Sequence, residues 1–444
     1  MKATLCQRIV LLLFVPIQLA IPLLVAVAEE NPHALINGRR QIAEFECTER
    51  IVVRYPFDIP MEALAEITND TKLTTIVEDD EEQEAALRLY RRHGLKIANC
   101  DFLHARTDSY WTRDYLPWLV AAQGAILAVD FQYNRERPLD NAVSSAFAKH
   151  LDIRLEHMPL VHTGGNILTD GRGKGFSTKL VLEENPLVSS EQIEATVRRV
   201  LGITEYHTLP DPNRTPIDHI NCWAKLLGVD KILLRSVPET DPEYIALEGL
   251  ADYLSRIPSS YGTPYRVFRV FSPSSEPYTN AIIVNDKVLV PLGGTSWDNP
   301  ALKVYREAMP GYRIFGINGH WLPTDGLACR TFGVPDRELL SIQHFPLSGA
   351  LNAMEAGFPV TANILSHGGH AVAENGATLH YASDGTSFRS IVLASHRHGV
   401  FHGTIPLHPS GTVISYYVQA TDVSGRTERH PFIGRHDPHV FRVE

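Results

Sequence analysis

Apolar residues recur at helical and strand-like intervals, in alternation, through the first 340 residues of the chain. Residues 79–93 place acids first, bases last and a glycine at the stop, the charge order that favours a helix. Ser189 and Gln192 have capping-box spacing, which predicts the start of a second helix. Further helices are expected to begin at Asp241-Pro242 and at Asn299-Pro300, the last of them ending at Pro310-Gly311.

Short segments rich in β-branched residues separate these helices and predict strands. They are residues 125–133, 231–237 and 281–290, and within the last one Asn285-Asp286 is expected to turn a hairpin. The helices are too few and the hairpins too many for a doubly wound sheet. The pattern therefore predicts an α/β domain of another kind.

The helical pattern stops near residue 345, and turn signals then recur at short intervals to the end of the chain. This spacing predicts a small β-sandwich. We place the boundary between Leu347 and Pro359, so that the two predicted domains are residues 29–350 and 351–444. The second domain shows no candidate chemistry and is expected to be a packing or spacer module rather than a binding module. Its expected strands are residues 379–381, 390–394 and 413–420.

Residues 1–28 have the order of a secretory signal peptide. Lys2 and Arg8 precede an apolar stretch over 9–25, and Ala26-Val27-Ala28 has the small-residue form of a cleavage site. The alternative is an uncleaved N-terminal anchor, against which two prolines interrupt the apolar run. The leader predicts export to a periplasmic or extracellular location, with no stable membrane span after its removal.

Composition and charge exclude several classes of protein. The chain has 444 residues, 44% hydrophobic and 21% charged, which is ordinary for a globular protein. A net charge of −10 argues against a nucleic-acid partner, which needs a basic face. Five cysteines are too few for a disulfide scaffold. Cys6 falls in the leader, which leaves Cys47, Cys100, Cys222 and Cys329, and Cys47 with Cys100 is one candidate pair among them. One cysteine is thus available as a reagent.

Asp114 stands between an arginine and aromatic residues in the segment 110–115. One interpretation is a buried, salt-bridged carboxylate with a structural role. The other is a carboxylate facing a cationic ligand, with Trp111 as an aromatic wall. The sequence alone leaves both open.

Two further segments carry polar residues suited to chemistry. If residues 218–221 are extended, His219 and Asn221 point to the same face of a strand. Cys329 is followed by Arg330, and a basic neighbour favours a thiolate. Taken alone, the histidine is an ordinary polar residue and the cysteine an inert buried thiol. No His-Glu-x-x-His or paired Cys-x-x-Cys pattern is present, so neither a metal nor another cofactor is expected.

Seven segments occur together, in the order of one known family. The chain resembles the secreted bacterial peptidylarginine deiminases of the Porphyromonas type, within the guanidino-group-modifying superfamily. The segments that carry the resemblance are Asp108–Tyr115, Tyr133–Pro138, His162–Asn166, Ile217–Trp223, Pro277–Asn280, Thr324–Thr331 and Pro431–Gly434.

The resemblance implies a five-bladed α/β propeller, the pentein fold, followed by an immunoglobulin-like β-sandwich. It also implies hydrolysis of the guanidinium of peptidyl-arginine to citrulline and ammonia, without calcium. The expected partners are arginine-containing peptides or proteins, with a C-terminal arginine favoured.

The resemblance also implies roles for individual residues. Cys329 would be the nucleophile, His219 the general acid and base, and Asp114 the carboxylate that grips the guanidinium. Asn280 would line the site beside the nucleophile. The residues implied to bind the rest of the substrate are Arg135 and Arg137, which would hold an α-carboxylate, and Trp111, Ile217 and Asp218, which would form the pocket.

The chain departs from the family at Asn221, where the family has a second guanidinium-binding aspartate. Loss of one charge-assisted hydrogen bond, worth about 1.5–3 kcal/mol, predicts a slower enzyme by roughly ten- to a hundredfold. Two alternatives therefore stand beside peptidyl-arginine hydrolysis. One is a deiminase of free arginine or agmatine, and the other is a non-catalytic binder of arginine-terminated peptides.

Overall fold

The computed structural model describes residues 38–213, 217–322, 325–397 and 399–444. The predicted leader, residues 1–28, lies outside the described residues. The described residues form one compact unit.

Several elements form where local sequence signals place them. Helix α2 (Asp80–His93) is capped by Asp79, whose carboxylate accepts the Glu82 N–H at 2.9 Å. Helix α6 (Ser190–Leu201) begins with the complete capping box of Ser189 and Gln192. The hairpin of β14 (Ile282–Val284) and β15 (Lys287–Leu292) turns at Asn285, which adopts φ +56°. These predictions are confirmed.

Two predicted helix starts are displaced by a residue or two. Helix α7 (Tyr244–Arg256) begins after Asp241, whose carboxylate instead accepts the Glu243 N–H in the preceding turn. Helix α8 (Asp298–Ala308) begins one residue before Asn299, because Asp298 already accepts N–H groups of the preceding loop.

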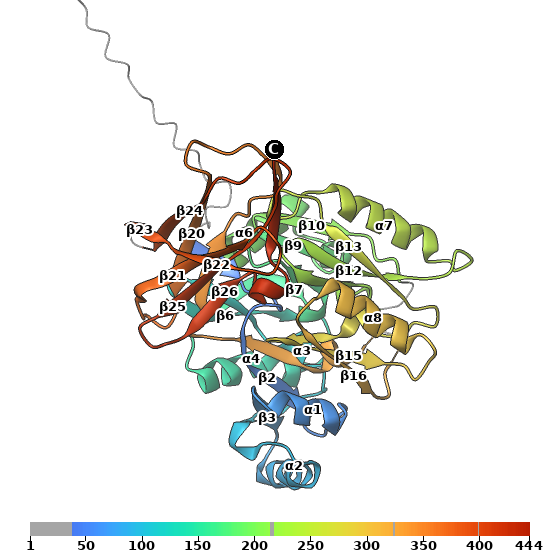
Figure 1. The fold of residues 1–444 in the computed structure, drawn as a ribbon. Coiled ribbons are helices and arrows are strands. Elements are labelled where there is room, and N and C mark those ends of the chain that lie inside the picture. Colours follow the sequence, from blue (N-terminus) through green and yellow to red (C-terminus); the bar gives the residue numbers. More distant parts are fainter. Residues whose placement is uncertain (1–37, 214–216, 323–324, 398) are drawn as a thin grey trace, which may run out of the picture. The chain divides into compact units, whose positions relative to one another are not determined.

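Five sheets within residues 38–335 share one plan (Figure 1). In each, the first strand is antiparallel to the second, and a helix leads from the second to a parallel third. The remaining elements of these units are β5 (Trp118–Ala122), β6 (Ala125–Tyr133), α4 (Pro138–Leu151) and β7 (Leu155–His162); β8 (Leu168–Thr169), β9 (Lys174–Thr178), α5 (Leu180–Glu183) and β10 (Glu205–Leu209); β11 (Ala224–Gly228), β12 (Lys231–Ser236) and β13 (Arg266–Phe271); β16 (Arg313–Asn318); and β17 (Phe332–Pro335), β2 (Thr48–Arg54), α1 (Met61–Thr68) and β3 (Lys72–Val77).

Two of these sheets carry an additional strand. β1 (Arg39–Gln41) pairs with β5, and β4 (Cys100–His104), preceded by the short η2 (Ile97–Asn99), pairs with β3. The pairing of β17 with β2 joins the two ends of this part of the chain in one sheet. The middle strands of the units are mostly buried on both faces, as in β12, whereas third strands such as β13 and β16 are partly exposed.

A short helical turn precedes the first strand of every unit. These turns are α3 (Thr112–Tyr115), η3 (Gly164–Asn166), η4 (Ile220–Cys222), η5 (Tyr278–Asn280) and α9 (Leu327–Arg330). α3 packs against both η3 and α9, η3 against η4, and η4 against η5. The five turns therefore converge on one region, which is where the candidate site lies.

The last hundred residues form two mainly antiparallel sheets around a shared apolar core. Strand β20 alternates strictly between buried and exposed positions, as a sandwich strand should. The sheets begin at β18, so their first strand precedes residue 351. Their elements are β18 (Leu340–His344), β20 (Phe358–Ser366), β24 (Val400–Ile405) and β23 (Ala394–Arg397); and β19 (Gly349–Leu351), β27 (His439–Val443), β25 (Val413–Asp422), β21 (Val372–Ala382), β22 (Arg389–Val392) and β26 (Thr427–His430), with η6 (Gly434–His436).

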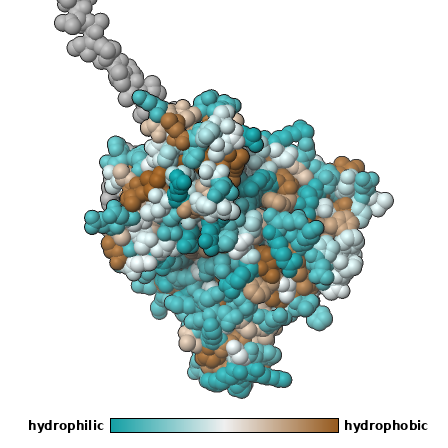
Figure 2. Space-filling view, in the orientation of Figure 1, coloured by the Kyte–Doolittle hydropathy of each residue, from teal (hydrophilic) through white to brown (hydrophobic). Residues whose placement is uncertain are grey.

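Polar and apolar side chains are interspersed over the face shown in Figure 2. No helix in the described ranges is both long and apolar enough to cross a membrane. The four cysteines of the described chain form no disulfide. Cys47 and Cys100, the candidate pair, form hydrogen bonds with other groups instead. The Cys47 thiol donates to Glu428 at 3.1 Å, and the Cys100 thiol donates to the Lys96 carbonyl at 3.6 Å.

Candidate active site

Cys329 lies in α9 with its side chain buried. The side chain of Asn280 contacts Cys329 at two points. Its Oδ1 accepts the Cys329 N–H at 2.9 Å, and its Nδ2 lies 3.2 Å from Sγ. The Nδ2 of Asn221 lies 3.4 Å from the same sulfur. Two amide donors thus face the sulfur, an arrangement that favours negative charge on it.

The surroundings nevertheless keep the sulfur protonated in the empty site. Burial and the negative charges of Asp114 and Asp325 raise the pKa of Cys329 to about 12, against the effect of the two amides. The prediction that Arg330 favours the thiolate is wrong. Its guanidinium is held by Asp325 at 2.8 and 3.1 Å and lies over the Trp321 ring. Ionisation of the thiol therefore requires a cation brought by a ligand.

Asp325 also links the cysteine segment to the predicted aromatic wall. Its Oδ2 accepts the indole N–H of Trp111 at 2.7 Å. The face of that indole is occupied by the Arg137 guanidinium, 4.5 Å from the ring centroid. Trp111 therefore positions Arg137, and Arg137 in turn would position any group that it binds.

Asp114 in α3 and His219 before η4 are both buried and face each other. Asp114 Oδ1 and His219 Nδ1 are 3.7 Å apart, beyond hydrogen-bonding distance. These two atoms and His219 Nε2 have no hydrogen-bond partner among the described residues. Buried polar atoms are normally paired, so three unpaired ones at one place indicate the position of a polar ligand.

Burial shifts both groups toward their neutral forms. It raises the pKa of Asp114 to about 7, although Arg135 and Arg137 act in the opposite direction. It lowers the pKa of His219 to about 3, and Arg135 contributes to this shift. The neutral imidazole of His219 can accept a proton. The carboxylate of Asp114 would ionise more fully if a cation bound beside it.

Gly165 in η3 leaves the space in which these two side chains meet. A Cβ atom at this position would lie 2.5 Å from His219 Nδ1 and 2.6 Å from Asp114 Oδ1. No side chain is compatible with both contacts. The absence of a side chain at this position is therefore required for the two groups to meet, a role that the sequence analysis did not assign.

Gly165→Ala is expected to reduce kcat/KM by about tenfold and to destabilise the fold by about 1–3 kcal/mol, as overpacking does. The matched control is Gly249→Ala in α7, where an added Cβ meets nothing within 4 Å. That substitution should stabilise the helix by about 0.5–1 kcal/mol. Urea unfolding would measure the stability of both variants, and ureido-group formation from a peptide ending in arginine would measure their activity. An unchanged activity for Gly165→Ala would contradict the assignment.

The prediction that His219 and Asn221 share a strand face is wrong. His219 is extended, but Asn221 belongs to the helical turn η4. Asn166 holds this segment, since its Oδ1 accepts the Ile220 N–H at 3.2 Å and the Thr178 N–H at 2.9 Å. Sequence reasoning missed Asn166, although it belongs to the same segment as Gly165.

Asp218 and Ile217 are half-buried and precede His219. Asp218 adopts φ +50°, a conformation that aspartate tolerates better than most residues. Its carbonyl accepts the Thr178 hydroxyl at 2.6 Å. The pocket role implied for both side chains stays a prediction.

Arg135 and Arg137 lie in the loop between β6 and α4. Arg137 donates to the Tyr133 hydroxyl at 3.1 Å. Both arginines act electrostatically on Asp114, so the structure brings them to the site. No group of three metal-ligating side chains is found among the residues described.

The geometry can be compared with known proteins. The model of the Porphyromonas-type peptidyl-arginine deiminase family matches residues 58–335, more than half of the chain. The chain belongs to this family. Membership makes it a deiminase-type hydrolase that acts on the carbon–nitrogen bonds of guanidino groups.

Related proteins share the fold at low identity. A protein of Marinomonas sp. MWYL1, named as a candidate agmatine deiminase, is 22% identical over 68% of this chain and 96% of its own length. The structure of a candidate arginine deiminase from Porphyromonas gingivalis matches with TM-score 0.59 and 20% identity, over 67% of this chain and 98% of that one. Agmatine deiminase of Enterococcus faecalis matches with TM-score 0.60 and 20% identity, over 68% and 96%. The mixed α/β fold with many sheets is thereby shown.

In this deiminase fold, the candidate side chains come from four of the five helical turns or their flanks. Asp114 comes from α3, His219 and Asn221 from η4, Asn280 from η5 and Cys329 from α9. The arrangement brings together a nucleophile, a proton acceptor and a carboxylate, all buried. These are the groups that nucleophilic attack on a bound cation requires.

Proposed function

We propose that the protein hydrolyses the guanidinium of peptidyl-arginine, preferably at a C-terminal arginine, to citrulline and ammonia. The observation that carries this proposal is the set of unpaired buried atoms of Asp114 and His219, close to the amide-bracketed Cys329. A guanidinium supplies N–H donors for the carboxylate and the positive charge that the thiol needs in order to ionise.

The first half of the reaction forms a covalent adduct. The guanidinium lowers the pKa of the Cys329 thiol, whose proton passes to neutral His219. The sulfur then attacks the guanidinium carbon and forms a carbon–sulfur bond in a tetrahedral adduct. His219 returns the proton to one amino group, and the carbon–nitrogen bond breaks to release ammonia. An amidino-thioether cation remains on the cysteine.

The second half consumes water. His219 takes a proton from a water molecule, whose oxygen attacks the same carbon. The carbon–sulfur bond breaks, the sulfur recovers a proton from His219, and a neutral ureido group leaves. The one remaining proton is carried away by ammonia as ammonium. Asp114 holds the cationic forms throughout, and the Asn280 and Asn221 amides stabilise the thiolate.

Arg135 and Arg137 support a peptide chain end as the substrate. The guanidinium groups of these two arginines act on Asp114 electrostatically and provide N–H donors for an α-carboxylate of the substrate. Indole stacking by Trp111 holds Arg137 in place. Agmatine has no carboxylate to engage either arginine.

A peptide ending in arginine tests the function. We expect ureido-group formation by the wild-type chain and none by Cys329→Ala. Arg137→Gln should reduce kcat/KM on this peptide by about tenfold but leave an amidated peptide unaffected, because a charge-assisted bond is worth about 1.5–3 kcal/mol. The absence of product above the Cys329→Ala background would refute the proposal.

Agmatine hydrolysis is the second candidate, since the named relatives include agmatine deiminases. A higher kcat/KM on agmatine than on the peptide would favour it and would count against the role given to the arginine pair. The third candidate, a non-catalytic binder, is motivated by Asn221. Tight peptide binding without turnover would support it.

We further propose that the five units close into a five-bladed propeller over residues 29–350 and that residues 351–444 form an immunoglobulin-like sandwich. Residues 1–28 would direct export and then be removed. The partners would be arginine-containing peptides or proteins outside the cytoplasm, and not nucleic acids. Mass spectrometry of the exported chain would locate its N-terminus.

A further inference from the structure

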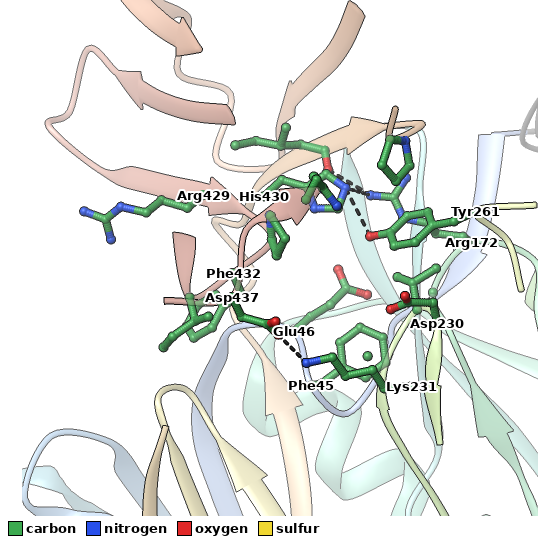
Figure 3. Close-up of a pocket in the computed structure, with 18 of the residues that line it drawn as sticks. Phe45, Glu46, Arg172, Asp230, Lys231, Tyr261, Arg429, His430, Phe432 and Asp437 are labelled. Atoms are coloured by element: carbon green, nitrogen blue, oxygen red, sulfur yellow. Dashed lines mark hydrogen bonds and ion pairs between the residues drawn. The ribbon is translucent and has the colours of Figure 1, made fainter. Parts of the chain in front are cut away.

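A cavity of about 310 Å³ separates the deiminase sheets from the C-terminal strands (Figure 3). Its upper wall contains Arg172 from the β8–β9 turn and Tyr261 from the loop after α7, together with His430 of β26. Its mouth reaches solvent at Arg266 and Val440, which are exposed. This volume lies at the lower end of the range of small-molecule sites.

Arg172 differs from the other cationic side chains that line the interior of the cavity. Arg40 pairs with Glu46 at 2.6 Å, and Lys231 pairs with Asp437. The Arg172 guanidinium has no carboxylate within 4.0 Å among the described residues. It donates instead to the Ile342 carbonyl at 3.1 Å and to His430 Nε2 at 2.9 Å.

The groups in direct contact with the Arg172 guanidinium are neutral. Arginine can only donate, so His430 Nε2 is an acceptor and His430 is neutral. Burial and Arg172 hold the pKa of His430 well below its usual value. Asp170 acts on Arg172 through space; its Oδ1 accepts the backbone N–H groups of Arg172 and Lys174, and its Oδ2 is buried without a hydrogen-bond partner among the described residues. His439 adds a buried Nε2 without a hydrogen-bond partner in the described part of the chain.

The carboxylates that also face the cavity have partners of their own. Asp230 pairs with Arg266 at 3.0 Å, and Glu428 accepts the Cys47 thiol at 3.1 Å. Arg429 points away from the cavity (Figure 3). Arg172 is therefore the interior cation that a ligand carboxylate can contact directly, while Asp170 contributes negative charge to the same wall.

Apolar and aromatic side chains form part of the wall. Phe45, Tyr312 and Phe432 line the cavity, with Leu347 and Pro431 beside them. The ring of Tyr261 lies 5.6 Å from the Arg172 guanidinium and restricts its orientation. An anion fixed by the guanidinium would thus project an apolar body against these rings.

We propose that this cavity binds a small organic monocarboxylate with an apolar or aromatic body, its carboxylate on Arg172. The site joins the deiminase sheets and the C-terminal strands, so the C-terminal part of the chain contributes to ligand binding and is not only a spacer. The proposal does not depend on the reaction at Cys329, because none of the cavity residues belongs to that site.

Isothermal titration of the purified chain with phenylacetate, and with phenylacetamide as the neutral isostere, tests the proposal. A ligand of about ten non-hydrogen atoms should bind with a Kd on the order of a millimolar. Phenylacetamide should bind at least about tenfold more weakly. Arg172→Gln should abolish this preference, and Val440→Trp, at the mouth, should weaken phenylacetate binding without removing the arginine.

Two controls separate this site from others. Arg266→Gln alters a cation that already has a carboxylate partner and should change phenylacetate affinity by less than about twofold. Arg137→Gln alters the deiminase site and should leave phenylacetate affinity unchanged. Equal affinities for the acid and the amide, retention of the preference in Arg172→Gln, or no binding at about 10 mM would each overturn the proposal.

Discussion

Replacing Asp114 with asparagine is expected to abolish hydrolysis of peptidyl-arginine while making the folded chain more stable at pH 8. The carboxylate is buried, and its Oδ1 has no partner among the described residues. Without this charge, a bound guanidinium would be buried with no counterion. We expect kcat/KM to fall by at least about a thousandfold, the order of effect of removing a preorganised group from a reacting centre.

In the empty site the same carboxylate destabilises the fold. Burial raises the pKa of Asp114 to about 7 in the folded chain, whereas an aspartate in the unfolded chain has a pKa of about 4. Ionisation of this carboxylate between these two pH values therefore favours the unfolded chain. The resulting cost grows as the pH rises through this interval and is constant above it. An asparagine side chain cannot ionise, so Asp114→Asn should gain about 2–4 kcal/mol at pH 8, and this gain should shrink as the pH falls.

Urea unfolding at pH 8 and pH 5 measures this difference. The matched control is Asp130→Asn, which removes a half-buried carboxylate of β6 located 3.7 Å from His157. It should change the free energy of unfolding by less than about 1 kcal/mol. If Asp114→Asn keeps more than about a tenth of wild-type activity, Asp114 is not the group that grips the guanidinium.

Elements governed by local chemistry could be predicted from the sequence. Asp79 and Gly94 delimit α2, and the capping box begins α6, because caps act on the few N–H and C=O groups next to them. The Asn285 turn was predictable for the same reason. The start of α7 was displaced because Asp241 forms a turn of its own before the helix.

The candidate site was only partly accessible in this way. The family resemblance selected Asp114, His219, Asn280 and Cys329, which the structure brings together. It did not show that Arg330 is held by Asp325, whose carboxylate also accepts the indole N–H of Trp111 from a distant segment. One signal was overlooked, since Asp114, His219, Asn280 and Cys329 each lie shortly before a strand that begins a new unit.

Asn221→Asp is the substitution expected to increase activity. The family resemblance implies an aspartate at this position, and a second carboxylate would accept guanidinium N–H groups opposite Asp114. One restored charge-assisted bond predicts a ten- to hundredfold gain in kcat/KM, taking about 1.5–3 kcal/mol for its contribution. The gain should be accompanied by a loss of stability in the empty enzyme of about 1–3 kcal/mol, since a second carboxylate is buried near the first.

Asn280→Asp is the matched control, because it makes the same change at the other amide that faces the sulfur. Asn280 uses Oδ1 to accept the Cys329 N–H and Nδ2 to donate to Sγ, so only an amide can make both bonds. The aspartate would raise the pKa of the thiol and supply no donor. Activity should therefore fall in this variant, by about tenfold or more.

The opposite responses of the two variants would distinguish a substrate-binding position from a thiolate-stabilising one. Asn221 Nδ2 also lies 3.4 Å from Sγ, so this amide has a possible role of its own. If Asn221→Asp loses activity as Asn280→Asp does, the donor on the sulfur is the functional group. The enzyme would then hold the guanidinium with a single carboxylate and stabilise the thiolate with two amides. Steady-state kinetics on one arginine-terminated peptide, with urea unfolding of each variant, decides between these two uses of the same position.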